Sequence, residues 1–279
     1  MKNILIPTDF SKNAWNAIEY AINFFSNTTC NFYILHINSL ANIVGSEVVY
    51  LPDQDAVAEV FTVPTKKKLN DVLKRIERLP INKKHRFFTL TDYNFFIDSI
   101  RKHVEEQKID LIVMGTKGAS GLKKIIIGSN TGYVITKVQC TTLVVPENAK
   151  YEKLKEIAFP TDFALFYSTE ILQPISEILE MHNAALRILH VNKRNIELNN
   201  DQKINKDYLE DYFNEYEHSF HFLTNINIEE AIQCFVESRD INIIAMVAKN
   251  LNYFQKILLS PKVKEIGYHT DIPFLVLHE

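Results

Sequence analysis

An internal repeat constrains the fold of this chain more than any other feature. The segment I-L-I-P-T-D-F-S at 4–11 returns 153 residues later as I-A-F-P-T-D-F-A at 157–164. The other matched pairs are 34–38 with 188–192, 109–114 with 241–246, and 142–146 with 273–277. Four matched segments in the same order indicate a duplicated domain. A chain of 279 residues is long enough for two such domains.

The offset between matched segments falls from about 153 to about 132 along the chain, so the second copy is shorter between its second and fourth strands. The first copy's last apolar segment ends at 146, which places the boundary near residue 148. We therefore expect one domain at 1–148 and a second at 149–279.

Within each copy, short apolar segments alternate with amphipathic ones. The strands predicted in the first copy lie near 3–7, 31–37, 84–90, 109–115 and 142–146. The predicted helices are 13–25, 64–79, 94–107 and 130–137. This alternation predicts an α/β fold, with two tandem doubly wound domains that each contain a five-stranded parallel sheet flanked by helices.

Glycines are concentrated in one window of the chain. Five of the seven lie between Gly115 and Gly132, directly after the apolar run 109–114. Glycine adopts positive φ readily and lets a ligand approach the backbone, so the window predicts a loop that holds a ligand; Gly128 is a candidate for positive φ. The window leads into the helix predicted at 130–137, and a helix start is a natural phosphate site. A glycine-rich surface turn is the alternative.

The charges exclude some classes of partner. Residues 1–148 carry a net charge of +4 and residues 149–279 a net charge of −7. An anionic ligand is therefore favoured in the first half, and neither half is basic enough for a nucleic-acid surface. No apolar run is long enough to cross a membrane, and the first residues are predicted to enter the fold as a strand. The three scattered cysteines argue against a disulfide framework, so we expect a cytoplasmic protein.

Over nearly its full length, the chain resembles a tandem of two universal stress protein domains. The nucleotide fingerprint of that family, G-x2-G-x9-G-[ST], is complete at Gly115, Gly118, Gly128 and Ser129. P-T-D-F-S follows the first predicted strand, and L-H-I lies on the second. The resemblance implies an adenine nucleotide alpha hydrolase-like fold with strand order 3-2-1-4-5. It also implies a role in the stress response and bound ATP, with or without Mg²⁺.

The resemblance also implies which residues contact the nucleotide. Asp9 is expected at the adenosine end, and the backbone of Ile37 at the adenine edge. Met114 and Gly115 are expected to line the ribose. The residues expected to hold the phosphates are Gly118, Gly128, Ser129 and Thr131. Two hydroxyls at a helix start agree with this phosphate assignment.

The second copy departs from the fingerprint. The residues opposite Gly115, Gly118, Gly121, Gly128 and Ser129 are Val247, Asn250, Tyr253, Ser260 and Pro261. Valine blocks access to the backbone, and proline removes an N–H donor. We therefore expect this half not to bind ATP in the manner of the family.

Several conspicuous residues have structural explanations. Asp162 preserves P-T-D-F in the half that lost the glycines, so Asp9 could cap the following helix as well as contact a ligand. His36 and His190 lack a partner at metal-binding spacing, and His218 and His221 should point to opposite faces of a strand. We expect no metal site. Cys140 is expected to pack in the core.

The expected function is that of an ATP-binding regulatory protein that holds one ATP in its N-terminal half, the second half being structural. No catalytic residue is expected, because no acidic residue lies between Gly115 and Gly132. A slow ATPase at the same site and a nucleotide-free interaction module are the alternatives. We also expect the apolar final strands, 142–145 and 274–277, to pair as an intramolecular pseudo-dimer, since exposed apolar edges promote aggregation. The sequence identifies no protein partner.

Overall fold

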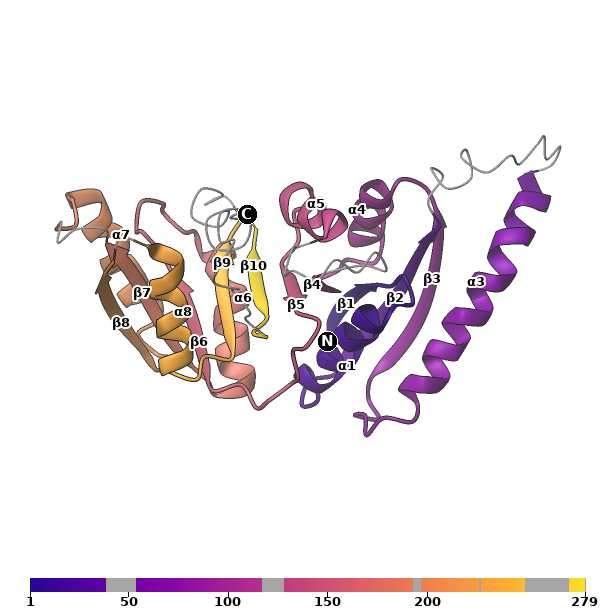
Figure 1. Ribbon diagram of the computed structural model, residues 1–279, viewed down its shortest axis with the longest axis horizontal. Helices are drawn as coiled ribbons and strands as arrows, with labels where there is room; N and C mark the ends of the chain where they lie inside the picture. Colours follow the sequence, from indigo (N-terminus) through magenta and orange to yellow (C-terminus); the bar gives the residue numbers. More distant parts are fainter. Residues whose placement is uncertain (39–53, 117–127, 193–196, 226, 249–270, 279) are drawn as a thin grey trace. The chain divides into compact units, whose positions relative to one another are not determined.

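The computed structural model describes all residues except 39–53, 117–127, 193–196, 226, 249–270 and 279 (Figure 1). By its internal contacts the chain forms two compact units. The first comprises Met1–Gly121 and Gly128–Cys140, and the second consists mainly of Thr141–Glu279. The contact boundary lies a few residues before the repeat boundary near 148, because the strand that closes the first repeat pairs within the second unit.

The first unit alternates strands and helices along the chain. Its elements are β1 (Lys2–Pro7), α1 (Lys12–Phe24), β2 (Cys30–Asn38), α3 (Gln54–Ile76), β3 (Arg86–Tyr93), α4 (Phe96–Glu106), β4 (Leu111–Gly115) and α5 (Ser129–Lys137). The strands are ordered β3-β2-β1-β4, and all three pairings are parallel. This agrees with the predicted α/β class.

Helices cover both faces of the first unit's sheet. Leu5 and Ile112 point to one face, where they pack with Ile100 of α4 and Val134 of α5; Figure 1 shows these two helices side by side. Ile4 and Ile6 point to the other face and are also fully buried, with α1 packed against β1 and β4. The unit is therefore doubly wound.

Cys140 belongs to the core that α4 and α5 form on the sheet, as predicted. Burial raises the pKa of its thiol to about 12, so the thiol stays protonated at neutral pH. Cys30 is also buried, and burial raises its pKa to about 11. Both residues act as small apolar side chains.

The second unit repeats the same alternation. Its elements are β5 (Thr142–Val145), β6 (Glu156–Pro160), α6 (Thr169–His182), β7 (Ala185–Asn192), α7 (Asn200–Tyr212), β8 (His218–Thr224), α8 (Ile228–Ser238), β9 (Ile243–Val247) and β10 (Phe274–Leu277). The strands are ordered β5-β10-β9-β6-β7-β8. All pairings in this unit are parallel except that of β10 with β5, in which Phe274 lies opposite Val144.

The two repeats share local geometry at the start of their fourth strands. The N–H of Asp110 donates to the carbonyl of Asn3 at 2.9 Å, and the N–H of Asn242 donates to the carbonyl of Glu156 at the same distance. In return, the Asp110 carboxylate accepts from the N–H of Asn3 at 2.7 Å, and the Asn242 side chain accepts from that of Glu156 at 3.0 Å. The two repeats identified in the sequence thus have equivalent hydrogen bonds at this position.

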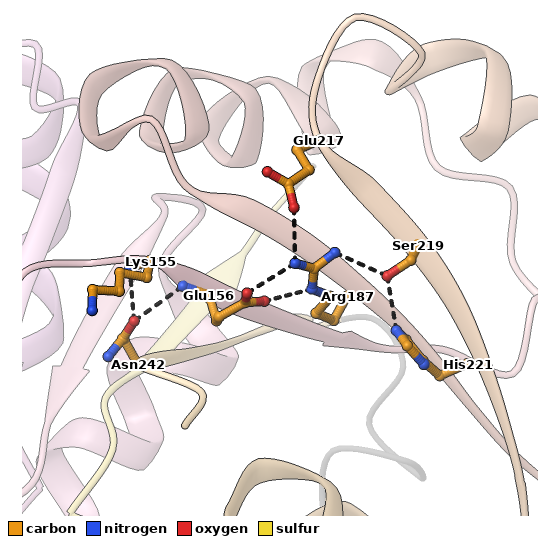
Figure 2. A network of polar contacts seen from close by, with 7 residues as sticks. All are labelled: Lys155, Glu156, Arg187, Glu217, Ser219, His221 and Asn242. Carbon is orange, nitrogen blue, oxygen red and sulfur yellow. Dashed lines mark hydrogen bonds and ion pairs between the residues drawn. The ribbon is translucent and has the colours of Figure 1, made fainter. Parts of the chain in front are cut away.

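Different side chains tie the strands together in the two units. In the second unit, Arg187 of β7 donates to Glu156 at 2.8 Å, to Ser219 at 3.0 Å and to Glu217 at 3.1 Å (Figure 2). At the matching places in the first unit, Tyr33 stacks on Phe88 with ring centroids 5.1 Å apart. A polar network and an aromatic pair therefore occupy equivalent positions on the two sheets.

Two predicted element bounds are wrong. The helix expected from 64 starts at Gln54 and includes Pro64, because the residues before the proline are good helix formers such as Ala56, Ala58 and Glu59. The third strand, expected at 84–90, runs from Arg86 to Tyr93, because its polar end continues to pair with β2 as far as Asn38. Tertiary pairing outweighs the polarity of these residues.

Among the helices that the structure describes, none combines the length and the apolar character needed to span a membrane.

Candidate functional site

A cavity of about 360 Å³ opens in the first unit at the carboxyl edge of its sheet. The ends of β1, β2 and β4 and the starts of α1, α4 and α5 surround it. The residues that line it are Pro7, Thr8, Asp9, Ala14, Leu35, His36, Ile37, Phe96, Met114, Gly115, Gly128, Ser129, Asn130 and Thr131. Ligands of doubly wound sheets bind at this edge.

Most of the residues predicted from the sequence meet at this cavity. Its lining includes the predicted residues Asp9, Ile37, Met114, Gly115, Gly128, Ser129 and Thr131. Gly118 lies outside the described residues.

The sequence prediction missed several lining residues. Thr8 and His36 adjoin predicted residues at strand ends, so their positions could have been inferred. Phe96 belongs to none of the matched segments, and it reaches the cavity because α4 begins there.

The turn after β1 is held by its own side chains. The hydroxyl of Thr8 accepts from the N–H of Phe10 at 3.1 Å, and the carboxylate of Asp9 accepts from the N–H of Ser11 at 3.0 Å. Phe10 has a positive φ of 65°. Such a conformation is uncommon for a bulky side chain, and these hydrogen bonds stabilise it.

Ser11 and His36 complete the turn. The Ser11 hydroxyl accepts from the N–H of Ala14 at 3.1 Å, which makes Ser11 the N-cap of α1. The Nδ1 of His36 lies 2.7 Å from the carbonyl oxygen of Thr8, so this nitrogen carries the proton and donates. The His36 ring lies 4.5 Å from that of Phe10 between centroids. His36 thus has a structural role at the cavity wall.

Gly115 allows β4 to pack closely on α1. A Cβ atom at this position would lie 2.8 Å from Cγ of Asn13, which is buried in α1. Carbon atoms do not approach so closely without a shift of one partner. Glycine is therefore required for this packing and leaves the backbone accessible at the cavity.

The start of α5 presents backbone donors to the cavity. Its N-cap, Gly128, has no side chain to accept from the N–H groups of the first turn, which lack helical partners. The expectation of a positive φ at Gly128 is wrong: φ is −57° and ψ is 152°, because the residue adopts an N-cap conformation. An uncapped helix start lined by Ser129 and Asn130 favours an anion.

Thr131 connects α5 to β4. Its hydroxyl donates to the carbonyl oxygen of Gly115 at 2.8 Å, and the residue is 3% exposed. The N–H of Gly128 also donates to a carbonyl, that of Thr116, at 2.5 Å. These bonds fix the helix start against the strand end and use two donors that a ligand could otherwise have taken.

The cavity lining combines two chemistries. Leu35, Ile37, Phe96 and Met114 form an apolar part, and the start of α5 forms the donor-rich part. Among the described residues that line the cavity, Asp9 is the single acidic one. A ligand with a flat apolar group and an anionic tail matches this lining.

The same turn occurs in the second unit. The N–H of Phe163 donates to the hydroxyl of Thr161 at 3.0 Å, and that of Ala164 to the carboxylate of Asp162 at 3.0 Å. Phe163 also has a positive φ, of 56°, and Nδ1 of His190 lies 2.9 Å from the carbonyl oxygen of Thr161. In both repeats the aspartate therefore stabilises the turn, and the expectation that Asp9 caps the following helix is wrong, because the N-cap residues are Ser11 for α1 and Ser168 for α6.

The surroundings of this second turn are filled by protein. Tyr167 lies 153 residues after Ala14, is 3% exposed, and has its hydroxyl 3.0 Å from that of Thr161. Two side chains of α7 donate to carbonyls of the turn, Gln202 to Asp162 at 2.7 Å and Asn205 to Phe163 at 2.8 Å. Val247, opposite Gly115 in the repeat, is buried.

Within the described ranges, no group of three or more His, Cys, Asp and Glu side chains is placed to hold a metal ion. His218 and His221 both lie on β8, three positions apart and so on opposite faces, as expected. His221 instead bonds Ser219 at 2.8 Å (Figure 2).

Comparison with known proteins decides the family. The sequence model described as the universal stress protein family matches residues 1–146 of this chain. The chain belongs to the universal stress protein family. The universal stress protein MJ0531 of Methanocaldococcus jannaschii is 30% identical over 149 residues, which cover 53% of this chain and 84% of that protein.

A second relative supports this assignment, and a solved structure has the same fold. The universal stress protein YxiE of Bacillus subtilis is 26% identical over 145 residues, covering 51% of this chain and 97% of that protein. The crystal structure of a universal stress protein from Archaeoglobus fulgidus covers 98% of this chain and 97% of its own, with a TM-score of 0.69 and 20% identity. This universal stress protein thus shares its α/β fold with a solved chain over nearly its full length.

Proposed function

We propose that this universal stress protein binds one ATP in its first domain, residues 1–148, while the second domain, 149–279, has a structural role. The protein then acts in the stress response as a regulator whose state depends on nucleotide occupancy. One observation carries the proposal: seven residues of the predicted site line one cavity that ends at the uncapped start of α5. An apolar wall and a helix start suit the two ends of a nucleotide.

We propose for the site residues the roles that the family resemblance implies, and the cavity lining supports this for those that the structure describes. Asp9 contacts the adenosine end, the backbone of Ile37 meets the adenine edge, and Met114 and Gly115 line the ribose. The phosphates, with or without Mg²⁺, lie against Gly118, Gly128, Ser129 and Thr131. Because the Thr131 hydroxyl donates to Gly115, Thr131 contacts phosphate through its N–H.

We propose a regulatory protein rather than an enzyme. Efficient phosphoryl transfer needs metal ligands and a group that orients the attacking nucleophile. Asp9 is the single acidic residue of the described lining, and its carboxylate already accepts from the N–H of Ser11. Slow hydrolysis at this site is the alternative, and a turnover assay on the ATP-loaded protein separates the two.

We further propose that the two domains form an intramolecular pseudo-dimer through their final strands. The antiparallel pairing of β10 with β5 supports this arrangement. Both strands are fully buried, and the tether between the domains raises their effective concentration. A cytoplasmic location is proposed because none of Cys30, Cys140 and Cys234 forms a disulfide.

Mass spectrometry of the ligand released on denaturation tests the proposed function. Freshly purified protein is expected to release ATP, or to retain added ATP through gel filtration. A different released compound, or failure to retain added ATP, would contradict the proposal.

A further inference from the structure

The outward face of α7 carries an unusual pattern for a surface helix. Asp201, Ile204, Tyr208 and Asp211 are spaced three, four and three residues apart and so share one face. Ile204 is 66% exposed. The opposite side of the helix holds it on the unit, through the fully buried Leu209 and the bonds that Gln202 and Asn205 donate to the turn after β6.

A phenylalanine from another segment extends this apolar face. Phe166, in the loop before α6, is 60% exposed, and its ring centroid lies 4.8 Å from that of Tyr208. The ring centroids of Tyr208 and Tyr212 lie 6.3 Å apart, and the Tyr212 hydroxyl accepts a hydrogen bond from the Ser176 hydroxyl of α6 at 3.1 Å. We call Phe166, Ile204 and Tyr208 the aromatic strip. The contacts of Tyr208 and Tyr212 hold its aromatic part between α6 and α7.

Acidic side chains surround the aromatic strip. Asp201 and Asp211 flank it on α7, where Asp207 is also exposed. On the α6 side, Glu170 is exposed in the first turn of the helix. Burial raises the pKa of Tyr208, and the charges of Tyr212 and Glu170 raise it further. Of the lysines on α7, Lys206 lies over the Phe220 ring at 4.4 Å and pairs with Glu210 at 3.4 Å, away from the strip, while Lys203 is exposed.

We propose that the aromatic strip is a docking surface for a basic amphipathic helix of a partner protein. Ile204 and Tyr208 lie one helical turn apart, about 6 Å, so apolar residues at positions i and i+4 of a partner helix match them. Lysines or arginines beside those anchors meet the acidic rim. A second copy of this chain is a poorer occupant, because a symmetric contact places the same acidic rim against itself. The inference does not depend on nucleotide binding in the first domain.

Fluorescence anisotropy tests this inference with two synthetic helical peptides that share one leucine face. One peptide carries lysines on its polar face and the other carries glutamates. The full-length protein is expected to bind the lysine peptide and not the glutamate peptide. Ile204→Glu together with Phe166→Ser should weaken binding at least tenfold. Both residues are exposed, so the fold should persist, which circular dichroism checks.

A matched control separates the aromatic strip from general surface effects. Val63→Glu with Phe95→Ser makes the same kinds of change at residues of the first unit that are 60% and 62% exposed. This control should bind the lysine peptide like the unmodified protein. Three results would overturn the inference. The protein could bind both peptides equally, the two double variants could lose the same amount of peptide affinity, or the Ile204→Glu, Phe166→Ser protein could bind the lysine peptide unchanged. So would dimerisation that Phe166→Ser abolishes, since a second copy would then be the occupant.

Discussion

The turn at 7–10 in the first domain and the turn at 160–163 in the second have the same backbone and different neighbours. Both place a phenylalanine at positive φ, and in both an aspartate carboxylate accepts from the N–H two residues later. In the first domain Ala14 leaves a cavity beside the turn, whereas in the second the buried Tyr167 bonds to it. The turn is therefore a structural element of the fold, and the space beside it decides whether a ligand can bind.

The fourth strands differ in the same way. Gly115 ends β4 with an accessible backbone, and Val247 ends β9 with a buried side chain. An aspartate preserved in both repeats is thus a weaker indicator of ligand binding than a glycine preserved in one.

The largest effect is expected where the two repeats are alike, in their final strands. Val144 and Val276 are both fully buried, in β5 and β10. Replacing each with Asp buries two carboxylates without partners, so we expect the free energy of unfolding to fall by more than about 4 kcal/mol in denaturant titrations. Val63→Asp, on an exposed surface, is the control and should change it by less than about 0.5 kcal/mol. Unchanged stability of the double variant would count against the pairing of these strands.

Acid should destabilise the second domain through two buried histidines, although burial also lowers the pKa of His85 and His103 in the first domain. Burial lowers the pKa of both His182 and His278 to about 4. Below pH 6.5 the unfolded chain protonates these rings while the folded chain does not, so stability falls as the pH drops from about 6.5 to 4. Each ring contributes up to about 1.4 kcal/mol per pH unit.

Urea titrations across this pH range measure the slope. Replacing both histidines with Gln should flatten it. If the slope in the double variant equals that of the unmodified protein, other groups account for the acid sensitivity.

Exchanging the residues that end the fourth strands tests the comparison at the ligand site. Gly115→Val adds a side chain whose Cβ would lie only 2.8 Å from Cγ of Asn13. We expect ATP affinity to fall at least about 100-fold, or about 2.7 kcal/mol, by calorimetry. The reciprocal variant, Val247→Gly, should lower the stability of the second domain and create no second binding site. If the Gly115→Val variant bound ATP with the affinity of the unmodified protein, the assignment of Gly115 to the ATP site would be wrong.

The smallest effect is expected from a single hydroxyl. Tyr167→Phe removes the contact with Thr161 and keeps the buried ring, so the second domain should lose about 1 kcal/mol of stability. ATP affinity of the first domain should not change. A change in that affinity, measured by the same calorimetry, would show that the filled turn of the second domain affects the site in the first domain.

The sequence could predict what depends on local pattern. The repeat, the alternation of strands and helices, and the strand-end positions of Asp9 and Ile37 are all encoded within short segments. Parallel strands bring such ends to one edge, which is why predicted residues far apart in the chain line one cavity.

The rest depends on packing between distant segments. Phe96 reaches the cavity because α4 begins there. Tyr167 packs against the second turn from the loop before α6, whereas the matching Ala14 lies within α1. Gln202 and Asn205 contact that turn from α7, and they align with no residue of a recognised motif. The sequence predicted that the Thr131 hydroxyl donates to phosphate, whereas in the folded chain it donates to the carbonyl oxygen of Gly115.

Calorimetric titration of the full-length protein with ATP tests the central claim most directly, since the claim is that only the first domain has a binding site. The account predicts saturation at about one equivalent of ATP per chain. Saturation at two equivalents, or no binding at any concentration, would contradict it.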